Sequence, residues 1–331
     1  MKNTYDLIGL GELLIDFTPV KDAKETYKAN PGGAPGNVVC TIQKYGYDTG
    51  FIGSIGRDHF GELLCETLAN FGVDVSLIEK IDEAFTTMAF VSLDENGDRS
   101  FSFARKPGAD TLLTLTEQHK KALSKTKILH FGTISMSHKN NRAATKEAVE
   151  LVRTKGGIIS FDPNLRLNLW DSKEELMEQV EWGLKHSDIL KMSSEDMADI
   201  TECDNDMYFI DLFKNTDLKL ILHSVGENGA YAISFDRENN ALIKAHADIA
   251  TNIYPVDTTG AGDIFTGAFL SKLLDALNNL EANTEIEKLE SYLNSKPDFH
   301  AALSFANLVA GTSTMSMGGI PSIPDFDKLN I

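Results

Sequence analysis

The sequence predicts an α/β fold in which helices cover both faces of a mostly parallel sheet. Short apolar runs of strand length recur at residues 49–56, 126–135, 156–162, 187–193 and 218–226. Patterns of helical period lie between most of them, at residues 58–71, 139–155, 173–185 and 194–201. Strands that alternate with helices along a chain pair in parallel, and the helices cover both faces of their sheet.

Residues 86–105 break this alternation and predict an antiparallel hairpin. Two segments of alternating apolar and polar side chains flank Asn96 and Gly97, which together form a strong turn signal. A hairpin inserted into an α/β chain is well placed to close over a ligand. We therefore expect a single domain over residues 1–331 with a small β lid, formed by residues 12–30 and 86–105.

The first apolar run, residues 5–17, suits one buried strand that Gly9 and Gly11 interrupt. These glycines match the start of the dinucleotide motif G-x-G-x-x-G, but Leu14 stands where the third glycine is required. A dinucleotide site is therefore not expected. Asp16 near the end of the run is a candidate for binding sugar hydroxyls, because ligands of parallel sheets bind at the carboxyl ends of strands; the alternative is a capping or turn residue.

The composition is that of an ordinary folded protein. The chain has 331 residues, of which 42% are hydrophobic and 24% charged. A net charge of −18 disfavours nucleic-acid partners, which bind through clustered Lys and Arg. The three cysteines lack the spacing of zinc or redox motifs, and no apolar run reaches the roughly 18 residues of a membrane span. We expect a cytoplasmic protein with reduced thiols and no membrane partner.

A glycine-rich stretch, residues 30–46, leads into a predicted helix. Gly32 and Gly33 allow the backbone to approach a ligand closely, and Asn37 offers both a donor and an acceptor near the helix start. A turn followed by a helix cap explains the same residues without a ligand, so both interpretations stay open.

The stretch FDPNLR places polar side chains just past a strand. Asp162 ends the strand, and Asn164 and Arg166 follow at its carboxyl end, where Arg can bind an oxyanion or a hydroxyl-rich ligand. Arg105, at the end of the predicted hairpin, is expected to approach the same ligand from above. For either arginine taken alone, a surface ion pair is the alternative.

The stretch DTTGAGD, residues 257–263, predicts a helix start that binds an anion. Gly260, Ala261 and Gly262 leave the first-turn amides uncovered, and the helix dipole adds positive potential there. Asp263 beside these amides suits a base that takes a proton from a hydroxyl attacking a phosphoryl group. The alternative is an acid that only favours the helix dipole.

The chain has no P-loop, protein-kinase, G-x-S-x-G or H-E-x-x-H motif.

The order of these motifs resembles that of one known family. GGAPGN comes early, DPNLR in the middle and DTTGAGD late, as in the ribokinase-like (PfkB) carbohydrate kinases, and the likeness runs from about Asp6 to Pro324. The strings FSFARKPGAD and FDPNLRLNLW are most similar to those of the fructokinase members. The resemblance implies a three-layer α/β/α fold with a central, mostly parallel sheet and a small β-sheet lid.

The resemblance also implies a role for each motif residue. Asp263 would be the catalytic base, beside an anion hole formed by Gly260, Ala261 and Gly262. The sugar pocket would be lined by Asp16, Gly32, Gly33, Asn37, Arg105, Asn164 and Arg166. The nucleotide would contact Ser193, Ser224, Gly226, Gly229 and Asn307. A monovalent cation such as K⁺ would lie near Asp257, Gly318 and Ser322.

The activity that the resemblance implies is transfer of the γ-phosphoryl group of ATP to a sugar hydroxyl, with fructose as first candidate and fructose 6-phosphate as product. Two alternatives stay open: a kinase for 2-keto-3-deoxygluconate, whose carboxylate could pair with Arg105 and Arg166, and an inactive regulatory protein that binds sugar or nucleotide.

Two further expectations follow from the resemblance. Many relatives carry N-x-x-E after the strand at residues 187–193, where this chain has Ser193 and Asp196. Asp196 would contact Mg²⁺ through water. The replacement of N-x-x-E by Ser193 and Asp196 would therefore change the side chains that hold the water molecules around the metal. Lid strands can pair between subunits in such kinases, so a homodimer through the lid is also expected.

Overall fold

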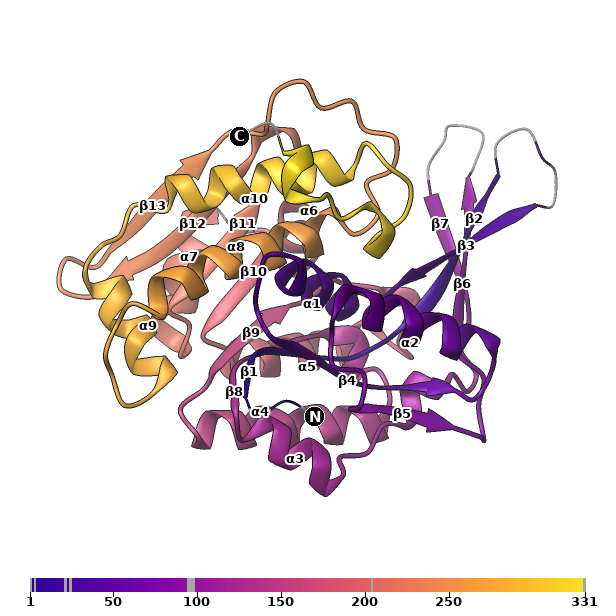
Figure 1. Cartoon of the computed structure of the whole chain (residues 1–331). Helices are drawn as coiled ribbons and strands as arrows, with labels where there is room; N and C mark the ends of the chain where they lie inside the picture. The colour runs from indigo at the N-terminus through magenta and orange to yellow at the C-terminus, as the bar shows by residue number, and fades with distance from the viewer. Residues whose placement is uncertain are drawn as a thin grey trace.

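The protein contains two sheets of different size. The computed structural model describes residues 2, 4–20, 23, 26–93, 99–203 and 205–329. Within these residues, the main sheet has nine strands in the order β13-β12-β11-β10-β9-β8-β1-β4-β5, and the small sheet has four in the order β3-β2-β6-β7. Figure 1 shows the small sheet projecting from the rest of the molecule.

The main sheet is mostly parallel, as predicted. Its strands are β1 (Tyr5–Leu10), β4 (Thr49–Gly56), β5 (Ile78–Ile81), β8 (Thr126–Gly132), β9 (Ile158–Asp162), β10 (Ile189–Ser193), β11 (Leu220–Ser224), β12 (Ala230–Asp236) and β13 (Ala241–Ala247). Only the last two strands run antiparallel to their neighbours in this sheet, as far as the chain is described. The carboxyl ends of the parallel strands therefore meet at one edge, where ligands of α/β proteins bind.

Helices cover both faces of the main sheet, and each face buries its own apolar core. One face carries α1 (Ala34–Lys44), α2 (His59–Phe71), α8 (Ala261–Leu277), α9 (Glu285–Asn294) and α10 (His300–Ser313). The other face carries α3 (Glu117–Leu123), α4 (Lys139–Thr154), α5 (Lys173–Lys185), α6 (Ser194–Ile200) and α7 (Asn205–Asn215). This is the three-layer arrangement that the sequence predicts (Figure 1). No helix in the described residues is long and apolar enough to cross a bilayer.

The small sheet is built from two separate parts of the chain. It comprises β2 (Leu14–Pro19), β3 (Tyr27–Gly32), β6 (Thr87–Leu93) and β7 (Arg99–Ala104). β6 and β7 pair antiparallel as the predicted hairpin; the turn predicted at Asn96 and Gly97 lies outside the described residues. Phe17 of β2 stacks on Phe90 of β6 with ring centroids 5.0 Å apart and meets Phe60 of α2 edge-on at 5.5 Å, which joins the small sheet to the main body.

The prediction of one strand over residues 5–17 is wrong. β1 ends at Leu10 and β2 begins at Leu14, and the two strands belong to different sheets. The turn between them packs tightly against α1, because a Cβ added to Gly11 would lie only 2.8 Å from Pro35 Cγ. The apolar pattern continues through the turn because β1 is almost fully buried and Leu13, Leu14 and Ile15 beyond the turn are buried as well, so periodicity alone does not reveal the break.

Candidate active site

A cavity of about 290 Å³ lies between the carboxyl ends of the main-sheet strands and the small sheet. Its walls come from the turn after β1, the start of α1, the segments after β8 and β9, the start of α8, and strands β2 and β7 of the small sheet. The structure thereby brings together most of the predicted sugar and catalytic residues, namely Asp16, Gly33, Asn37, Asn164, Arg166, Gly260 and Asp263.

The start of α8 forms one wall of this cavity. Gly260 caps the helix with a left-handed φ of 76°, and a Cβ at this position would lie 2.9 Å from Asn37 Nδ2, so both backbone and space require glycine. The amide of Ala261 donates to the carbonyl oxygen of Thr258 at 3.2 Å and is already used in the turn. The amides of Gly260 and Gly262 remain as candidate donors to an anion at the helix start.

Asp263 lies in the first turn of α8, and its carboxyl group accepts a hydrogen bond of 2.8 Å from Asn37 Nδ2. Burial, reinforced by the charge of Asp162, raises the pKa of Asp263 to about 7, while the bond from Asn37 and the charges of Lys191 and Arg166 oppose the rise. The ordinary pKa of an aspartate would leave it a weak base at neutral pH. A pKa near 7 suits a group that must accept a proton and release it in each turnover.

Asp16 belongs to β2 of the small sheet rather than to the end of a main-sheet strand. Burial raises its pKa to about 7, although the charge of Arg166 opposes the rise. A Cβ at Gly32 would lie 2.6 Å from Asp16 Oδ2, and one at Gly33 would lie 2.4 Å from the carbonyl oxygen of Glu12. Gly32 therefore leaves room for the carboxyl group of Asp16 within the small sheet, and Gly33 lets the start of α1 approach the turn between β1 and β2.

Arg166 and Asn164 line the cavity, but the structure does not bring Arg105 into it. The guanidinium group of Arg105 is buried and donates to Asp110 Oδ2 from Nε at 2.9 Å and from Nη2 at 2.6 Å. It also donates to Ser137 Oγ and to the carbonyl oxygen of Ile134. Arg105 therefore ties the end of β7 to the main body, in a buried ion pair rather than a surface one.

Glu12 lines the cavity and was not predicted as a site residue. Its Oε1 accepts a hydrogen bond of 2.9 Å from the amide of Ala34, whereas its Oε2 is buried without a hydrogen-bond partner among the described residues. Burial raises the pKa of Glu12 to about 7. No spacing signal could have identified it, because a single acid in an apolar run is an ordinary turn feature.

Lys191 of β10 was not predicted either. Its ammonium group forms an ion pair with Asp162 at 3.2 Å, and a Cβ at Gly262 would lie 3.0 Å from Nζ. From the sequence alone, a lysine within a strand is expected on a face exposed to solvent. In the structure, however, the side chain of Lys191 is only 7% exposed. Its position depends on the packing of α8 over β10, which the sequence alone does not show.

The predicted nucleotide residues gather at the ends of β10, β11 and β12. Ser193 Oγ caps α6 by accepting from the amide of Asp196 at 3.0 Å, and the left-handed Gly226 and Gly229 bound the turn that follows Ser224. Asn307 of α10 donates to the carbonyl oxygens of Ala247 and Asp248, both at 2.9 Å.

Two of the three residues predicted to hold a monovalent cation, Asp257 and Gly318, are joined by a hydrogen bond. Asp257 is buried, and its Oδ2 accepts from the amide of Gly318 at 2.8 Å. Ser322 donates instead to the carbonyl oxygen of Gly319. The hydrogen bond between Asp257 and Gly318 thus joins the two segments that the resemblance singles out.

Comparison with known proteins identifies the family to which this site belongs. Residues 4–325 match the pfkB family of carbohydrate kinases. The chain belongs to this family. Over 330 residues it is 36% identical to probable fructokinase-5 of Arabidopsis thaliana, with 98% of this chain and 96% of that protein covered. As a pfkB carbohydrate kinase, the protein is a phosphotransferase that acts on sugar hydroxyls.

Solved structures of fructokinases share the fold of this pfkB kinase. Fructokinase from Xylella fastidiosa with bound ATP superimposes with a TM-score of 0.84 at 26% identity, covering 98% of this chain and 97% of that one. A double-mutant fructokinase from Vibrio cholerae O395, in a form with fructose, ADP and a potassium ion bound, gives a TM-score of 0.79 at 26% identity, covering 99% and 98%.

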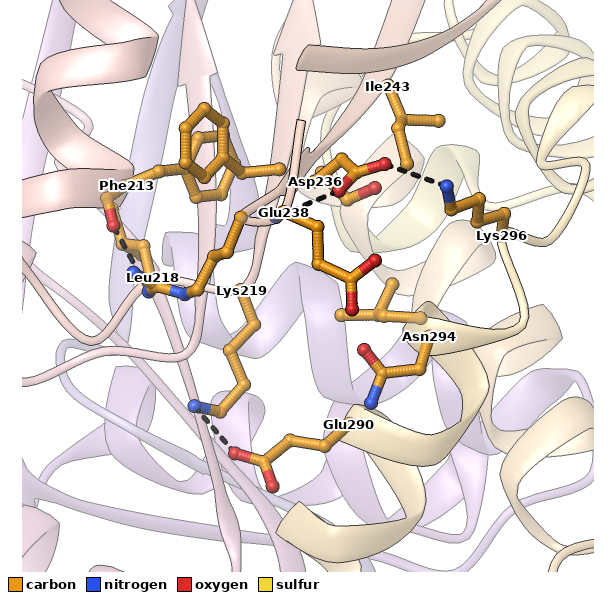
Figure 2. Close-up of a pocket in the computed structure, with 13 residues that line it drawn as sticks. Phe213, Leu218, Lys219, Asp236, Glu238, Ile243, Glu290, Asn294 and Lys296 are labelled. Atoms are coloured by element: carbon orange, nitrogen blue, oxygen red, sulfur yellow. Dashed lines mark hydrogen bonds and ion pairs between the residues drawn. The ribbon is translucent and has the colours of Figure 1, made fainter. Parts of the chain in front are cut away.

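A second cavity of the kinase, of about 480 Å³, lies at the opposite end of β11 (Figure 2). Four of its charged side chains form two ion pairs, Lys219 with Glu290 at 3.0 Å and Lys296 with Asp236 at 2.7 Å, and the oppositely charged Arg237 and Glu238 also line it. Charges that neutralise each other leave little potential for an anionic ligand. The cavity beneath the small sheet is therefore the candidate active site.

Proposed function

We propose that the protein transfers the γ-phosphoryl group of ATP to fructose, giving fructose 6-phosphate and ADP. The observation that carries this proposal is the position of Asp263, which lies at the start of α8, is held by Asn37 and opens into the same cavity as Asp16 and Arg166. The similarity to fructokinases, including the form with fructose and ADP bound, supports fructose as the sugar.

In the proposed reaction Asp263 accepts the proton of the attacking sugar hydroxyl. The sugar oxygen then bonds to the γ-phosphorus as the bond from phosphorus to the bridging oxygen of ADP breaks. The amides of Gly260 and Gly262 donate to the phosphoryl oxygens, whose charge redistributes in the transition state. Asp16 and Asn37 bind other hydroxyl groups and fix the sugar, so that only one oxygen faces the phosphorus.

The charges of the cavity support a neutral sugar over 2-keto-3-deoxygluconate. Glu12, Asp16 and Asp263 all line it, and their ionised forms repel a carboxylate substrate. Arg105 is already neutralised by Asp110, which leaves Arg166 as the arginine that borders the cavity in the described structure. One arginine against several carboxyl groups does not favour a sugar acid.

We propose that the small sheet acts as the lid of this site. Leu14, Asp16 and Phe103 line the cavity from it, so a movement of the sheet would open or close the sugar pocket. Closure excludes water, which would otherwise accept the phosphoryl group. Its edge strands β3 and β7 also offer backbone groups for a homodimer, which analytical ultracentrifugation would test.

We propose that Mg²⁺ enters with ATP as part of the substrate. Among the residues described, no group of three or more His, Cys, Asp or Glu side chains could hold a metal directly. The two oxygens of Asp196 accept hydrogen bonds from the amide of Leu165 and from Ser193 Oγ, so a contact through water fits better than direct ligation. Asp257 and Gly318 are proposed to stabilise the loop around a bound K⁺.

The experiment that tests this function is sugar-dependent ADP release from MgATP. Fructose, 2-keto-3-deoxygluconate, ribose, glucose and adenosine are compared by kcat/KM, with and without K⁺. We expect fructose to give the highest value. A higher value for 2-keto-3-deoxygluconate would overturn the choice of sugar, and sugar binding without ADP release from any of the five would favour the regulatory alternative.

A further inference from the structure

Lys191 is a buried cation in the centre of the main sheet. β10 lies between β9 and β11, and its residues alternate between the two faces: Ile189 packs in the core beneath α8, and Leu190 and Met192 pack in the opposite core. Lys191 therefore faces α8, where the strand pattern would place an apolar side chain. A charge in such a place costs free energy unless it is paired or used for function.

The ammonium group of Lys191 lies beside the anion-binding start of α8. Its Nζ is 3.2 Å from Asp162 Oδ2, and a Cβ at Gly262 would lie 3.0 Å from Nζ. Any larger residue at position 262 would displace the ammonium group, so glycine at this position allows the cation to reach the helix start. Asp196 and Asp263 are close enough for their charges to act on Lys191, which places it among three carboxyl groups.

An ammonium group has three hydrogen-bond donors, and Asp162 is the one side chain within ion-pair distance of Nζ among the described residues. The helix start next to it would bind the transferred phosphoryl group under the proposed function. A cation beside two backbone donors gains most when negative charge develops there, because the surroundings are nearly free of water.

We infer that Lys191 is a catalytic residue that contacts the γ-phosphoryl group during transfer and stabilises its negative charge together with the amides of Gly260 and Gly262. The inference rests on the proposed phosphoryl transfer, and it adds a side-chain cation to an anion hole otherwise made of backbone. No bond to Lys191 forms or breaks; its ammonium group stays protonated throughout the step.

The competing interpretation gives Lys191 a structural role, in which it only neutralises Asp162. The two roles differ in a double variant. If Lys191 only balances the charge of Asp162, removing both charges in Asp162→Asn/Lys191→Met restores the activity that Lys191→Met loses. If Lys191 stabilises the phosphoryl group, the double variant stays at least as slow as Lys191→Met.

We expect Lys191→Met to lower kcat by about 10² to 10³, the usual effect of removing one donor to a transition-state oxyanion. KM for the sugar and the affinity for ADP should change by a few-fold at most, since Lys191 does not line the sugar cavity. Recovery of kcat in the double variant would overturn the inference, as would a kcat in Lys191→Met close to that of the wild type.

A second measurement covers the case in which Lys191→Met does not fold. A crystal structure of the wild type with MgADP and aluminium fluoride, a mimic of the phosphoryl group in transfer, should place Nζ within about 3 Å of a fluorine atom. A longer separation would overturn the inference. The fluoride complex is also prepared without sugar, so its result does not depend on the identity of the sugar. Failure of the wild type to phosphorylate any sugar would instead reject the proposed function.

Discussion

The proposed site would bind its two ligands by different means. The sugar half would use carboxyl side chains, those of Glu12, Asp16 and Asp263, and burial raises the pKa of each to about 7. The phosphoryl half would use the amides at the start of α8 together with Lys191, which lies beside that helix start. The contrast follows the chemistry of the substrates, because sugar hydroxyls are donors that need acceptors, whereas phosphoryl oxygens are acceptors that need donors.

The contrast also shows where the active site lowers the stability of the folded state. Carboxyl groups with raised pKa values destabilise the folded state once they ionise, since the unfolded chain ionises them more easily. The amides of the phosphoryl half are neutral and carry no such penalty. The sugar half is therefore where we expect activity and stability to oppose each other.

The largest effect should come from the residue that stands between the two halves. Replacing Asp263 by Asn removes the base but keeps a side chain that can contact Asn37. We expect kcat to fall by about 10² to 10⁴, the usual share of a general base. Steady-state kinetics measures this loss. A variant with near-normal turnover would show that Asp263 is not the base.

The second effect is the pH dependence of kcat/KM, which should follow the ionisation of Asp263. Asp263 acts as a base only when ionised, so kcat/KM should fall about tenfold for each pH unit below 7 and level off above it. The profile is measured from pH 5.5 to 8.5 at saturating MgATP, so that titration of the nucleotide does not enter. A flat profile would contradict a base whose pKa lies near 7.

The third effect is confined to the sugar half. A Cβ in Gly32→Ala would lie 2.6 Å from Asp16 Oδ2 and should displace that carboxyl group. We expect KM for fructose to rise roughly tenfold, which corresponds to about 1.4 kcal/mol of binding, with KM for ATP nearly unchanged. Equal effects on both substrates would show that the two halves are not separate.

The last effect is on the stability of the fold and leaves catalysis aside. Because the pKa of Glu12 is raised to about 7 in the folded state, the wild type should lose stability as the pH rises from about 4.5 to about 7. Glu12→Gln should lose less stability over this range, since it lacks this group but keeps Asp16 and Asp263. At pH 8 the variant should be more stable to urea by roughly 1 to 3 kcal/mol, a gap that closes at pH 4.5. The exposed Glu66→Gln is the control. A constant gap at all pH values would rule out ionisation of Glu12 as its cause.

The same division governs what the sequence could predict. The phosphoryl half was predicted from DTTGAGD alone, because glycines at a helix start have a local physical meaning that does not depend on distant residues. Lys191 was missed since its surroundings come from α8 and β9, far away in the chain. Arg105 was expected in the sugar pocket, yet Asp110, five positions on, is its partner, a pairing that only the folded chain reveals.

The alternation of strands and helices predicted the main sheet because each βα unit carries its own periodicity. The prediction for residues 5–17 was wrong because the turn at Gly11 packs against Pro35 of α1, a tertiary contact that the local apolar pattern does not show. Asp16 lines the cavity, but its strand belongs to the small sheet and not to the main sheet from which its position was predicted. Glu12 gave no signal, because its burial depends on the start of α1.

The central claim is that Asp263 lies where the sugar hydroxyl meets the terminal phosphate. Its most direct test is a crystal structure of the protein with fructose and a non-hydrolysable MgATP analogue. The account predicts that one fructose hydroxyl lies about 3 Å from the carboxylate of Asp263 and points toward the terminal phosphorus, which rests on the amides of Gly260 and Gly262. A sugar bound with every hydroxyl out of reach of Asp263, or a terminal phosphate held away from the start of α8, would contradict it.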